Sequence, residues 1–249
     1  MTKRVALVTG SGKKRVGWHV ANALGNKGYE IVLHYRSSEK EAKSSVQELI
    51  SQGVQAIALQ ADLTSEKEVR RLFQAIEAQH SRLDVLVNCA SIYPSRRLED
   101  VTAEDLSQNF AANVLSTFLC AQQAGLKMVQ QSEGGCIINL GDWAIQRPYL
   151  DHSAYFVSKG SIPTLTRTLA VELASRNPKV RVNCIHPGPV MFPEGLSEDE
   201  QNALVEATLV KRADAPETIA QAVIALVENE FITGACIPVD GGRSIFAPS

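Results

Sequence analysis

A tyrosine and a lysine four residues apart are the side chains in this sequence best suited to acid-base chemistry. Tyr155 and Lys159 lie in the stretch Ser-Ala-Tyr-Phe-Val-Ser-Lys at residues 153–159. On a helix, residues at this spacing share one face, so the Lys159 ammonium can stabilise the Tyr155 phenolate and lower the pKa of Tyr155 toward neutrality. Such a tyrosine can donate a proton to a carbonyl or imine that receives a hydride. Because this spacing also occurs by chance, its surroundings decide what it means.

A glycine-rich turn, residues 9–17, follows the first apolar run of the chain. At Gly10 and Gly17 the absence of a side chain lets backbone N–H groups and the positive end of a helix approach a pyrophosphate. Arg15 and Val16 belong to the same turn, and two lysines precede them. The turn therefore predicts a dinucleotide site, with solvated surface charges as the alternative interpretation of the basic residues.

Short apolar runs alternate with longer amphipathic segments, which predicts strands alternating with helices. We expect seven strands, at residues 5–8, 31–34, 56–60, 85–88, 137–140, 180–185 and 235–239. Runs without polar alternation indicate strands buried on both faces. The predicted fold is therefore α/β, a Rossmann-type doubly wound parallel sheet of seven strands with helices on both faces. The strands' C-terminal ends then meet in one crevice, where this architecture places its chemistry.

Length and composition limit the remaining possibilities. The 249 residues, 45% of them hydrophobic, favour a single domain spanning residues 1–249. A formal net charge of -2 with scattered basic residues argues against nucleic acid and membrane partners. We expect a cytoplasmic protein, because the first strand begins almost at Met1 and no window approaches the roughly 18 apolar residues of a membrane span. Five cysteines without a C-x-x-C pair favour reduced thiols, and the five histidines show no metal-ligand spacing, so no metal is predicted.

Two segments depart from the regular alternation. Residues 189–212 contain Pro189, Pro193 and Gly195 before an acidic helix start, and we interpret them as a mobile lid over the substrate. A surface excursion without function is the alternative. Pro163 lies one turn after Lys159 and predicts a bend in the helix that carries the Tyr-Lys pair.

The residues after the second and third predicted strands bear on the cofactor. An NAD site is expected to carry an acid after the second strand, but the sequence there is His-Tyr-Arg-Ser-Ser at residues 34–38. Arg36 and the neighbouring hydroxyl groups suit a 2'-phosphate, so NADPH is the predicted cofactor. Tyr35, Arg36 and Ser37 are the expected contacts there. Asp62, followed by Leu63, can accept from the adenine amino group or serve a structural role at a helix start.

Further motifs accompany these features, and the chain resembles the short-chain dehydrogenase/reductase family over essentially its whole length. The motifs are Asn-Cys-Ala-Ser at 88–91, Asn113 in the following long helix, Arg-Val-Asn at 181–183 leading to Pro187-Gly188, and Thr-Gly at 233–234 before Val-Asp-Gly-Gly at 239–242. The resemblance implies that Asn88 and Ala90 line the cofactor, Asn113 holds a water in a proton relay toward Lys159, and Pro187, Gly188 and Val190 flank the nicotinamide. It also implies a homotetramer formed through the helices that contain Asn113 and Tyr155.

Asp142 departs from that family pattern, because a catalytic serine usually stands thirteen residues before the tyrosine. In this respect the chain is similar to the pteridine reductase and dihydromonapterin reductase-like branch. A carboxyl group can accept from ring N–H donors or deliver a proton to an imine nitrogen, whereas serine is a weak acid. A dry pocket raises the pKa of Asp142 and Lys159 lowers it, and the sequence leaves the balance open. The alternative is a loop acid that caps local backbone.

The same branch is similar at residues 14–17, 34–37 and 90–94. Carried over by position, Arg15 and Ser91 touch both cofactor phosphate and pterin. The loop after Ser91 is one residue shorter than in that branch, so either Ile92 or Tyr93 stacks on the substrate. Phe192 stands where many family members have a threonine against the nicotinamide amide. It either forms a pocket wall or leaves the amide to the backbone.

The sequence therefore predicts an NADPH-dependent reductase of a pteridine or dihydrofolate-type C=N bond. Its predicted catalytic residues are Asp142, Tyr155, Lys159 and Asn113, and its predicted substrate contacts are Arg15, Ser91, Tyr93, Asp142 and Phe192. Reduction of a 3-oxoacyl thioester or another ketone is the nearest alternative, since the family resemblance fits that chemistry. A non-catalytic nucleotide-binding sensor is the alternative from another class.

Overall fold

The computed structural model describes residues 3–192, 195–213 and 215–246. The strands within these ranges are β1 (Val5–Thr9), β2 (Glu30–Tyr35), β3 (Ala56–Gln60), β4 (Val85–Asn88), β5 (Gly135–Leu140), β6 (Val180–Pro187) and β7 (Cys236–Val239). The helices are α1 (Val16–Asn26), α2 (Glu39–Ser51), α3 (Glu66–Gln79), α4 (Ala103–Asn109), α5 (Ser116–Val129), α6 (Ser153–Gly160), α7 (Ile162–Ala174), α8 (Glu198–Glu206) and α9 (Glu217–Glu228). Short helical segments are η1 (Leu98–Asp100), η2 (Phe110–Leu115) and η3 (Trp143–Ile145).

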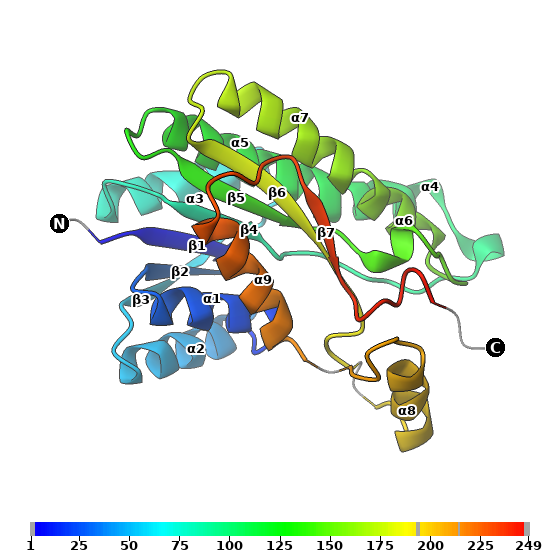
Figure 1. Cartoon of the computed structure of the whole chain (residues 1–249). Coiled ribbons are helices and arrows are strands. Elements are labelled where there is room, and N and C mark those ends of the chain that lie inside the picture. The colour runs from blue at the N-terminus through cyan, green and yellow to red at the C-terminus, as the bar shows by residue number, and fades with distance from the viewer. Residues whose placement is uncertain (1–2, 193–194, 214, 247–249) are drawn as a thin grey trace.

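All seven strands pair in parallel in the order β3-β2-β1-β4-β5-β6-β7 (Figure 1). The order reverses between β1 and β4, which is the switch point of a doubly wound sheet. The predicted fold is confirmed, and each strand lies within two residues of its predicted bounds. Because every strand is parallel, all seven C-terminal ends lie along one edge of the sheet.

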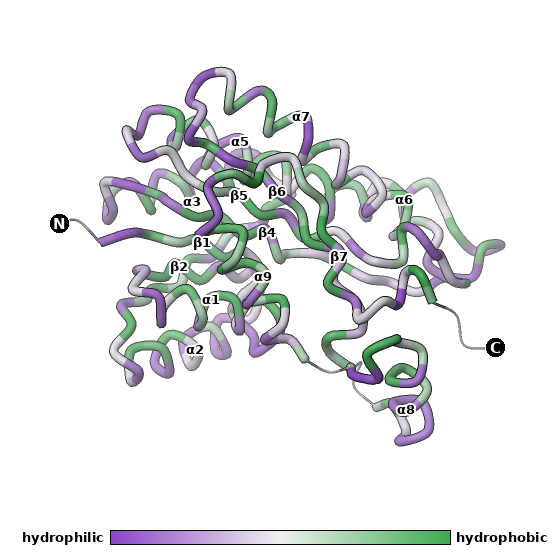
Figure 2. The backbone as a smooth tube through the Cα atoms, viewed as in Figure 1, coloured by the Kyte–Doolittle hydropathy of each residue, from purple (hydrophilic) through white to green (hydrophobic). Residues whose placement is uncertain are grey.

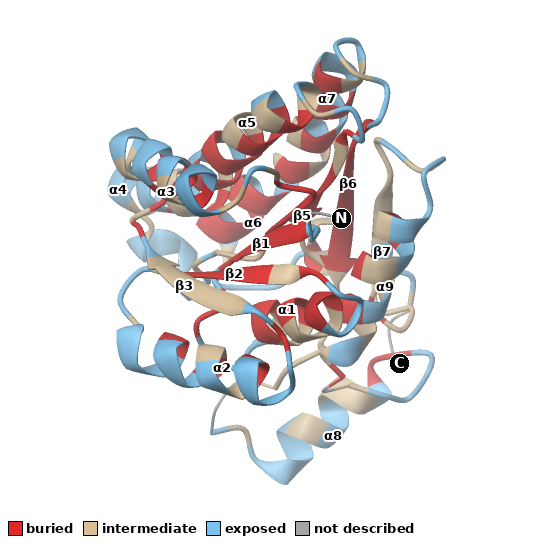
Figure 3. Cartoon of the chain, turned by 90° about the vertical axis from the view of Figure 1, so that its left-hand side faces the viewer, coloured by how far each residue is buried: buried red, intermediate tan, exposed pale blue. Residues whose placement is uncertain are grey.

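Two apolar layers cover the sheet and explain why the strands are apolar throughout. Along β1, Leu7 packs with the layer of α3, α5 and α7, whereas Val8 packs with the layer of α1 and α9. Successive strand side chains point to opposite faces, so a strand covered on both faces needs an apolar residue at nearly every position. Figure 2 shows these strands as hydrophobic, and Figure 3 shows β1, β2 and β6 buried between the helices.

Two irregular helical stretches stand at the C-terminal edge of the sheet. The bend predicted at Pro163 is found as a break, in which α6 ends at Gly160 and α7 begins at Ile162. The predicted long helix around Asn113 consists of α4, the π-helical segment η2 and α5. Such π-helical turns occur frequently at functional sites.

The segment interpreted as a lid contains α8, which begins at Glu198 as the acidic start predicted. Ser197 caps it through a bond from the Glu200 backbone N–H, and the Glu200 carboxylate bonds back to Ser197. Residues 193 and 194, including Pro193, lie outside the described residues. Within the described ranges no helix combines the length and the apolar character that crossing a membrane requires.

Candidate active site

Asp142 and Tyr155 meet beyond the C-terminal end of β5. The Tyr155 hydroxyl donates to Oδ2 of Asp142 at 2.6 Å, and both residues are largely buried. The other carboxyl oxygen, Oδ1, accepts from the backbone N–H of Ala144 at 2.8 Å and caps η3. The capping role considered for Asp142 is therefore present, and its other oxygen holds the Tyr155 phenol, while its part in proton transfer stays a prediction.

Burial dominates the titration of this pair. Desolvation raises the pKa of Asp142, although the bonds from Tyr155 and Ala144 and the charge of Lys159 oppose the rise. The pKa of Tyr155 lies far above its usual range, first because of burial and second because of the Asp142 carboxylate. The lowered pKa predicted for Tyr155 is therefore wrong for this arrangement. Of the two groups, Asp142 gives up its proton first.

Lys159 is almost completely buried near Asp142 and Tyr155. Its ammonium donates to the carbonyl oxygen of Leu140 at 2.8 Å and lies 5.9 Å from the centre of the Tyr155 ring. Burial lowers the pKa of Lys159, and the Asp142 carboxylate opposes this. The lysine is thus held by the end of β5, at a distance from the tyrosine.

Asn113, in η2, connects the loop after β4 to α6. Its Oδ1 accepts from the Ile92 N–H at 2.9 Å, and its Nδ2 donates to the Ile92 carbonyl at 3.2 Å. The same Nδ2 donates to Oγ of Ser158 at 3.0 Å, and that hydroxyl donates to the carbonyl of Tyr155 at 2.7 Å. Asn113 therefore positions α6, and its part in a proton relay stays a prediction.

Aromatic rings cover the solvent side of Tyr155. Tyr93 lies edge-on to Tyr155, with ring centres 4.8 Å apart, and stacks on His152 at 4.3 Å. Its hydroxyl group lies 2.6 Å from that of Tyr149. Tyr93 is therefore the residue of this pair whose ring lies against Tyr155, and its stacking on the substrate stays a prediction. Sequence reasoning missed Tyr149 and His152, although their closeness in the chain to Tyr155 was a usable signal.

His186 is a second histidine that the sequence analysis missed. It lies buried near the end of β6, and its Nδ1 accepts from the backbone N–H of Asp142 at 3.2 Å. Burial lowers the pKa of His186, and the charge of Lys159 adds to the effect. The imidazole is thus a neutral support for the backbone of Asp142. Its position at the C-terminal end of a strand was the only sequence signal for it.

The glycine-rich turn brings backbone close to the loop after β4, at the start of α1. Gly10 has a φ of 64°, and a Cβ there would lie 2.8 Å from the Cα of Ala90. At the start of α1, Arg15 makes no side-chain cap and the first turn contains no acidic residue. The Trp18 N–H already bonds to the Arg15 carbonyl, so the helix offers an anion its positive end and the N–H groups before Trp18. These features fit a dinucleotide cofactor.

The other predicted cofactor contacts follow the C-terminal ends of the strands. Tyr35 ends β2, with Arg36 and Ser37 exposed beyond it; Asp62 and Leu63 follow β3; Asn88 ends β4, with Ala90 beyond it; Pro187 ends β6, and Gly188 and Val190 follow. The Oδ1 of Asp62 accepts from the Thr64 backbone and hydroxyl, which is a structural role in the loop, whereas the cap of α3 itself is Ser65. All of these residues lie along one edge of the sheet.

The predicted substrate contacts are less closely assembled. Tyr93 and Asp142 both contact Tyr155. Arg15 and Ser91 are exposed on loops, and in the described part of the chain no hydrogen bond joins either of them to Asp142 or Tyr155. Phe192 lies partly buried after β6.

A buried histidine, His34, joins the glycine turn to β2 and β3. Its Nδ1 accepts from the Gly10 N–H at 3.1 Å, and its Nε2 lies 3.0 Å from the carbonyl of Ala61. An Nε2–H tautomer satisfies both bonds. Burial lowers the pKa of His34 to about 4. The turn is therefore held by a neutral imidazole.

We expect the protonation of His34 to make stability depend on pH. In the unfolded chain the pKa is 6.5, whereas burial lowers it to about 4 in the folded chain. Between these values the unfolded state binds more protons, so the free energy of unfolding falls as the pH falls. Denaturant titrations should show a loss of about 2 kcal/mol from this group between about pH 7 and pH 5. The dependence should shrink in His34→Asn and persist in His19→Asn; equal slopes in all three proteins would contradict it.

Comparison with known proteins decides the family. The family description "Enoyl-(Acyl carrier protein) reductase" matches residues 11–244. An uncharacterized oxidoreductase of Methylorubrum extorquens is 35% identical over 246 residues, covering 96% of this chain and 97% of that protein. The chain belongs to the short-chain dehydrogenase/reductase family. A 3-oxoacyl-[acyl-carrier-protein] reductase of Staphylococcus epidermidis is 31% identical, with 95% of this chain and 97% of that protein covered.

Solved structures of the short-chain family agree with the fold. Acetoin dehydrogenase from Enterobacter cloacae superposes with a TM-score of 0.88 at 31% identity, covering 100% of this chain and 99% of that one. The short-chain family uses NAD(H) or NADP(H), which the glycine turn of this oxidoreductase fits. Its members act on small molecules.

Proposed function

We propose that this short-chain oxidoreductase uses NADPH to reduce a C=N bond of a pteridine or dihydrofolate-type substrate. The observation that carries the proposal is the buried carboxyl group of Asp142, hydrogen-bonded to Tyr155 at 2.6 Å. Burial keeps this carboxyl protonated to a higher pH than an exposed one. A neutral carboxyl beside a phenol is a stronger acid than the phenol and suits delivery of a proton to a ring nitrogen.

The cofactor supplies a hydride when it is bound. Tyr155 and Asp142 then manage the proton that the substrate nitrogen takes up, and the ionised carboxylate can accept from a ring N–H or amino donor. Lys159 binds the cofactor ribose in this proposal. Tyr93 is half-exposed, and in this proposal its ring stacks on the substrate. Such stacking favours a planar heterocycle over a flexible acyl chain.

Reduction of a 3-oxoacyl thioester or another ketone is the second candidate. It is supported by the name of the Staphylococcus epidermidis relative, and the family description also names an acyl carrier protein, although with an enoyl group. NADPH oxidation with dihydrobiopterin, dihydrofolate and acetoacetyl thioester, measured side by side, separates the candidates. Turnover of the thioester alone would overturn the pteridine proposal. Tight NADPH binding without turnover across a broad panel would indicate a nucleotide-binding sensor.

The choice of NADPH leads to a prediction at Arg36. This side chain is exposed just beyond β2 and is the expected partner of the 2'-phosphate. We expect Arg36→Ala to lower kcat/KM for NADPH by about 10- to 100-fold, the effect of losing a charge-assisted hydrogen bond. The value for NADH should change little. The exposed Arg70→Ala is the matched control, and equal losses with both cofactors would contradict the assignment.

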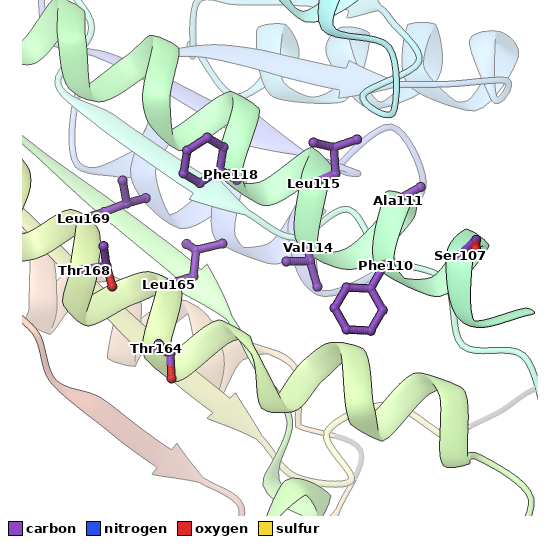
Figure 4. Close-up of a pocket in the computed structure, with 10 residues that line it drawn as sticks. All are labelled: Ser107, Phe110, Ala111, Val114, Leu115, Phe118, Thr164, Leu165, Thr168 and Leu169. Atoms are coloured by element: carbon purple, nitrogen blue, oxygen red, sulfur yellow. The ribbon is translucent and has the colours of Figure 1, made fainter. Parts of the chain in front are cut away.

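We also propose a homotetramer formed through the helices around Asn113 and Tyr155. A groove of about 510 Å³ lies between η2 and α5 on one side and α7 on the other (Figure 4). Phe110, Leu115 and Phe118 on this groove are each more than a third exposed. Apolar side chains exposed together in this way suit burial against another chain. Light scattering measures the mass of the protein in solution, and the mass of a monomer would contradict the homotetramer.

Three further proposals concern the chain as a whole. We propose that residues 1–249 form one domain, that residues 189–212 act as a lid over the substrate, and that the protein is cytoplasmic. The joining of all seven strands in one sheet supports the first proposal. The position of α8, close to the C-terminal segment in Figure 1 and outside the sheet layers, supports the second. All five cysteines are free thiols, which suits a reducing compartment.

A further inference from the structure

Two thiols and an imidazole gather where β6 and β7 pair. Cys184 and His186 are two residues apart on β6 and point to the same face. Cys236 lies directly opposite Cys184 on β7. The ligand atoms of these three residues all lie within 4.8 Å of one another, and Cys184 Sγ is 3.9 Å from His186 Nδ1. The strand pairing thus brings Cys236 beside two donors that lie far from it in the sequence.

We infer that Cys184, His186 and Cys236 form a binding site for a thiophilic divalent cation, with Zn²⁺ as the representative ion. Thiolates and imidazole are the ligands that zinc prefers in proteins. At bond lengths of about 2.0 to 2.3 Å, tetrahedral ligands lie about 3.3 to 3.8 Å apart, so the donors need to approach by only about 1 Å. Binding releases the two thiol protons to solvent, and the two thiolates then balance the charge of the ion.

The surroundings give an ion an entry path. Gly141 packs closely against two of the donors, because a Cβ there would stand 2.3 Å from His186 Nδ1 and 3.2 Å from Cys184 Sγ, so only glycine leaves these donors in place. Cys236 is only partly buried on β7, in contrast to buried β6 (Figure 3). Arg167 lies 4.0 Å from its sulfur atom and can balance a thiolate. An ion can therefore enter from the β7 side, where a water molecule can complete its coordination.

Occupation of this site acts on Asp142 through His186. The lone pair of His186 Nδ1 currently accepts from the Asp142 N–H at 3.2 Å. A neutral imidazole has one acceptor nitrogen, so a metal bound to Nδ1 takes that acceptor away from Asp142. The ion should therefore slow catalysis by disturbing the carboxyl group next to Tyr155. This inhibition rests on the proposed function, whereas the binding of the ion does not.

Titration of the reduced, metal-free protein with Co²⁺ tests the binding. We expect one ion per chain, with a thiolate-to-metal charge-transfer band. Cys236→Ala and Cys184→Ala should each weaken binding by more than the 10- to 100-fold that loss of an outer hydrogen-bond partner costs. Cys120→Ala removes a buried thiol outside the cluster and should bind as the wild type does. A missing band, or unchanged binding in Cys236→Ala, would overturn the site.

Alkylation of Cys236 by iodoacetamide, followed by mass spectrometry, measures metal binding independently of enzyme activity. Zn²⁺ should slow the reaction about 10-fold or more, and EDTA should restore it. Protection reversed by dithiothreitol and not by EDTA would identify a disulfide and overturn metal binding. In activity assays Zn²⁺ should inhibit the wild type and not Cys236→Ala. Inhibition that is equal in both proteins, or absent despite measured binding, would overturn the coupling to Asp142.

Discussion

Replacing Tyr155 with phenylalanine should lower kcat by about 100- to 10,000-fold, the range for loss of a positioned general acid. The change removes the hydroxyl that bonds to Asp142 at 2.6 Å and leaves the ring packed against Tyr93. Burial and the Asp142 carboxylate both hold the proton on Tyr155. The phenol therefore gives up its proton readily only if it receives another one at the same time. Asp142, which is bonded to the phenol, is the group placed to supply it.

Steady-state kinetics and NADPH binding should be measured together on this variant. NADPH affinity, followed by fluorescence, should stay within about two-fold of the wild type, because Lys159 is held by the Leu140 carbonyl and not by Tyr155. Tyr29→Phe is the matched control, since Tyr29 is a buried tyrosine in the layer of α1 and α9, outside the cluster that contains Tyr155. A Tyr155→Phe enzyme within about 10-fold of wild-type kcat would exclude the phenol as the proton donor.

Asp142→Ser should separate the two candidate substrates. We expect turnover of dihydrobiopterin and dihydrofolate to fall by about 100- to 1,000-fold, because serine cannot supply a carboxylic acid proton to nitrogen. Turnover of acetoacetyl thioester should be kept or raised, since a hydroxyl group polarises a carbonyl. A uniform loss on all substrates would mean that Asp142 serves mainly to fix the loop through Ala144.

Asp142→Asn separates the proton-donating role of the carboxyl group from its role in holding the loop. An amide retains an oxygen that can accept from the Ala144 N–H, so η3 should stay capped. The pKa of Asp142 is raised by burial, so its titration should appear in the pH profile of kcat at a higher pH than that of an exposed carboxyl group. If the protonated carboxyl is the donor, kcat on pterins falls as the pH rises through that pKa. This limb should vanish in Asp142→Asn, and its persistence would assign the limb to another group.

The strands were predictable because burial on both faces leaves a continuous apolar run in the sequence. Tyr155 and Asp142 were predicted to be catalytic from spacing and from a departure in the family pattern, and the structure places them in contact. The sign of the Tyr155 pKa shift was wrong because spacing reveals Lys159, whereas burial and the orientation of a carboxylate appear only in three dimensions.

Other features depend on segments that meet only in the folded chain. His34 is neutral and buried because the Gly10 N–H and the Ala61 carbonyl approach it from two other segments. The grouping of Cys184 with Cys236 follows from the pairing of β6 with β7, which no local spacing reveals. The π-helical register of η2 was likewise not readable, since its composition is that of an ordinary helix.

The helix that carries Tyr155 and Lys159 is only eight residues long, because the helical hydrogen bonding is interrupted between Gly160 and Ile162, just before Pro163. A helix of this length is not stable in water by itself. Its place depends on a small apolar cluster that Tyr155 and Phe156 form with Ala144, and on bonds from Asn113 to Ser158 and from Lys159 to Leu140. The sheet, in contrast, is held by two much larger apolar layers. Warming should therefore inactivate the protein while its sheet is still folded. The secondary structure that remains after warming is then a poor measure of the activity that remains.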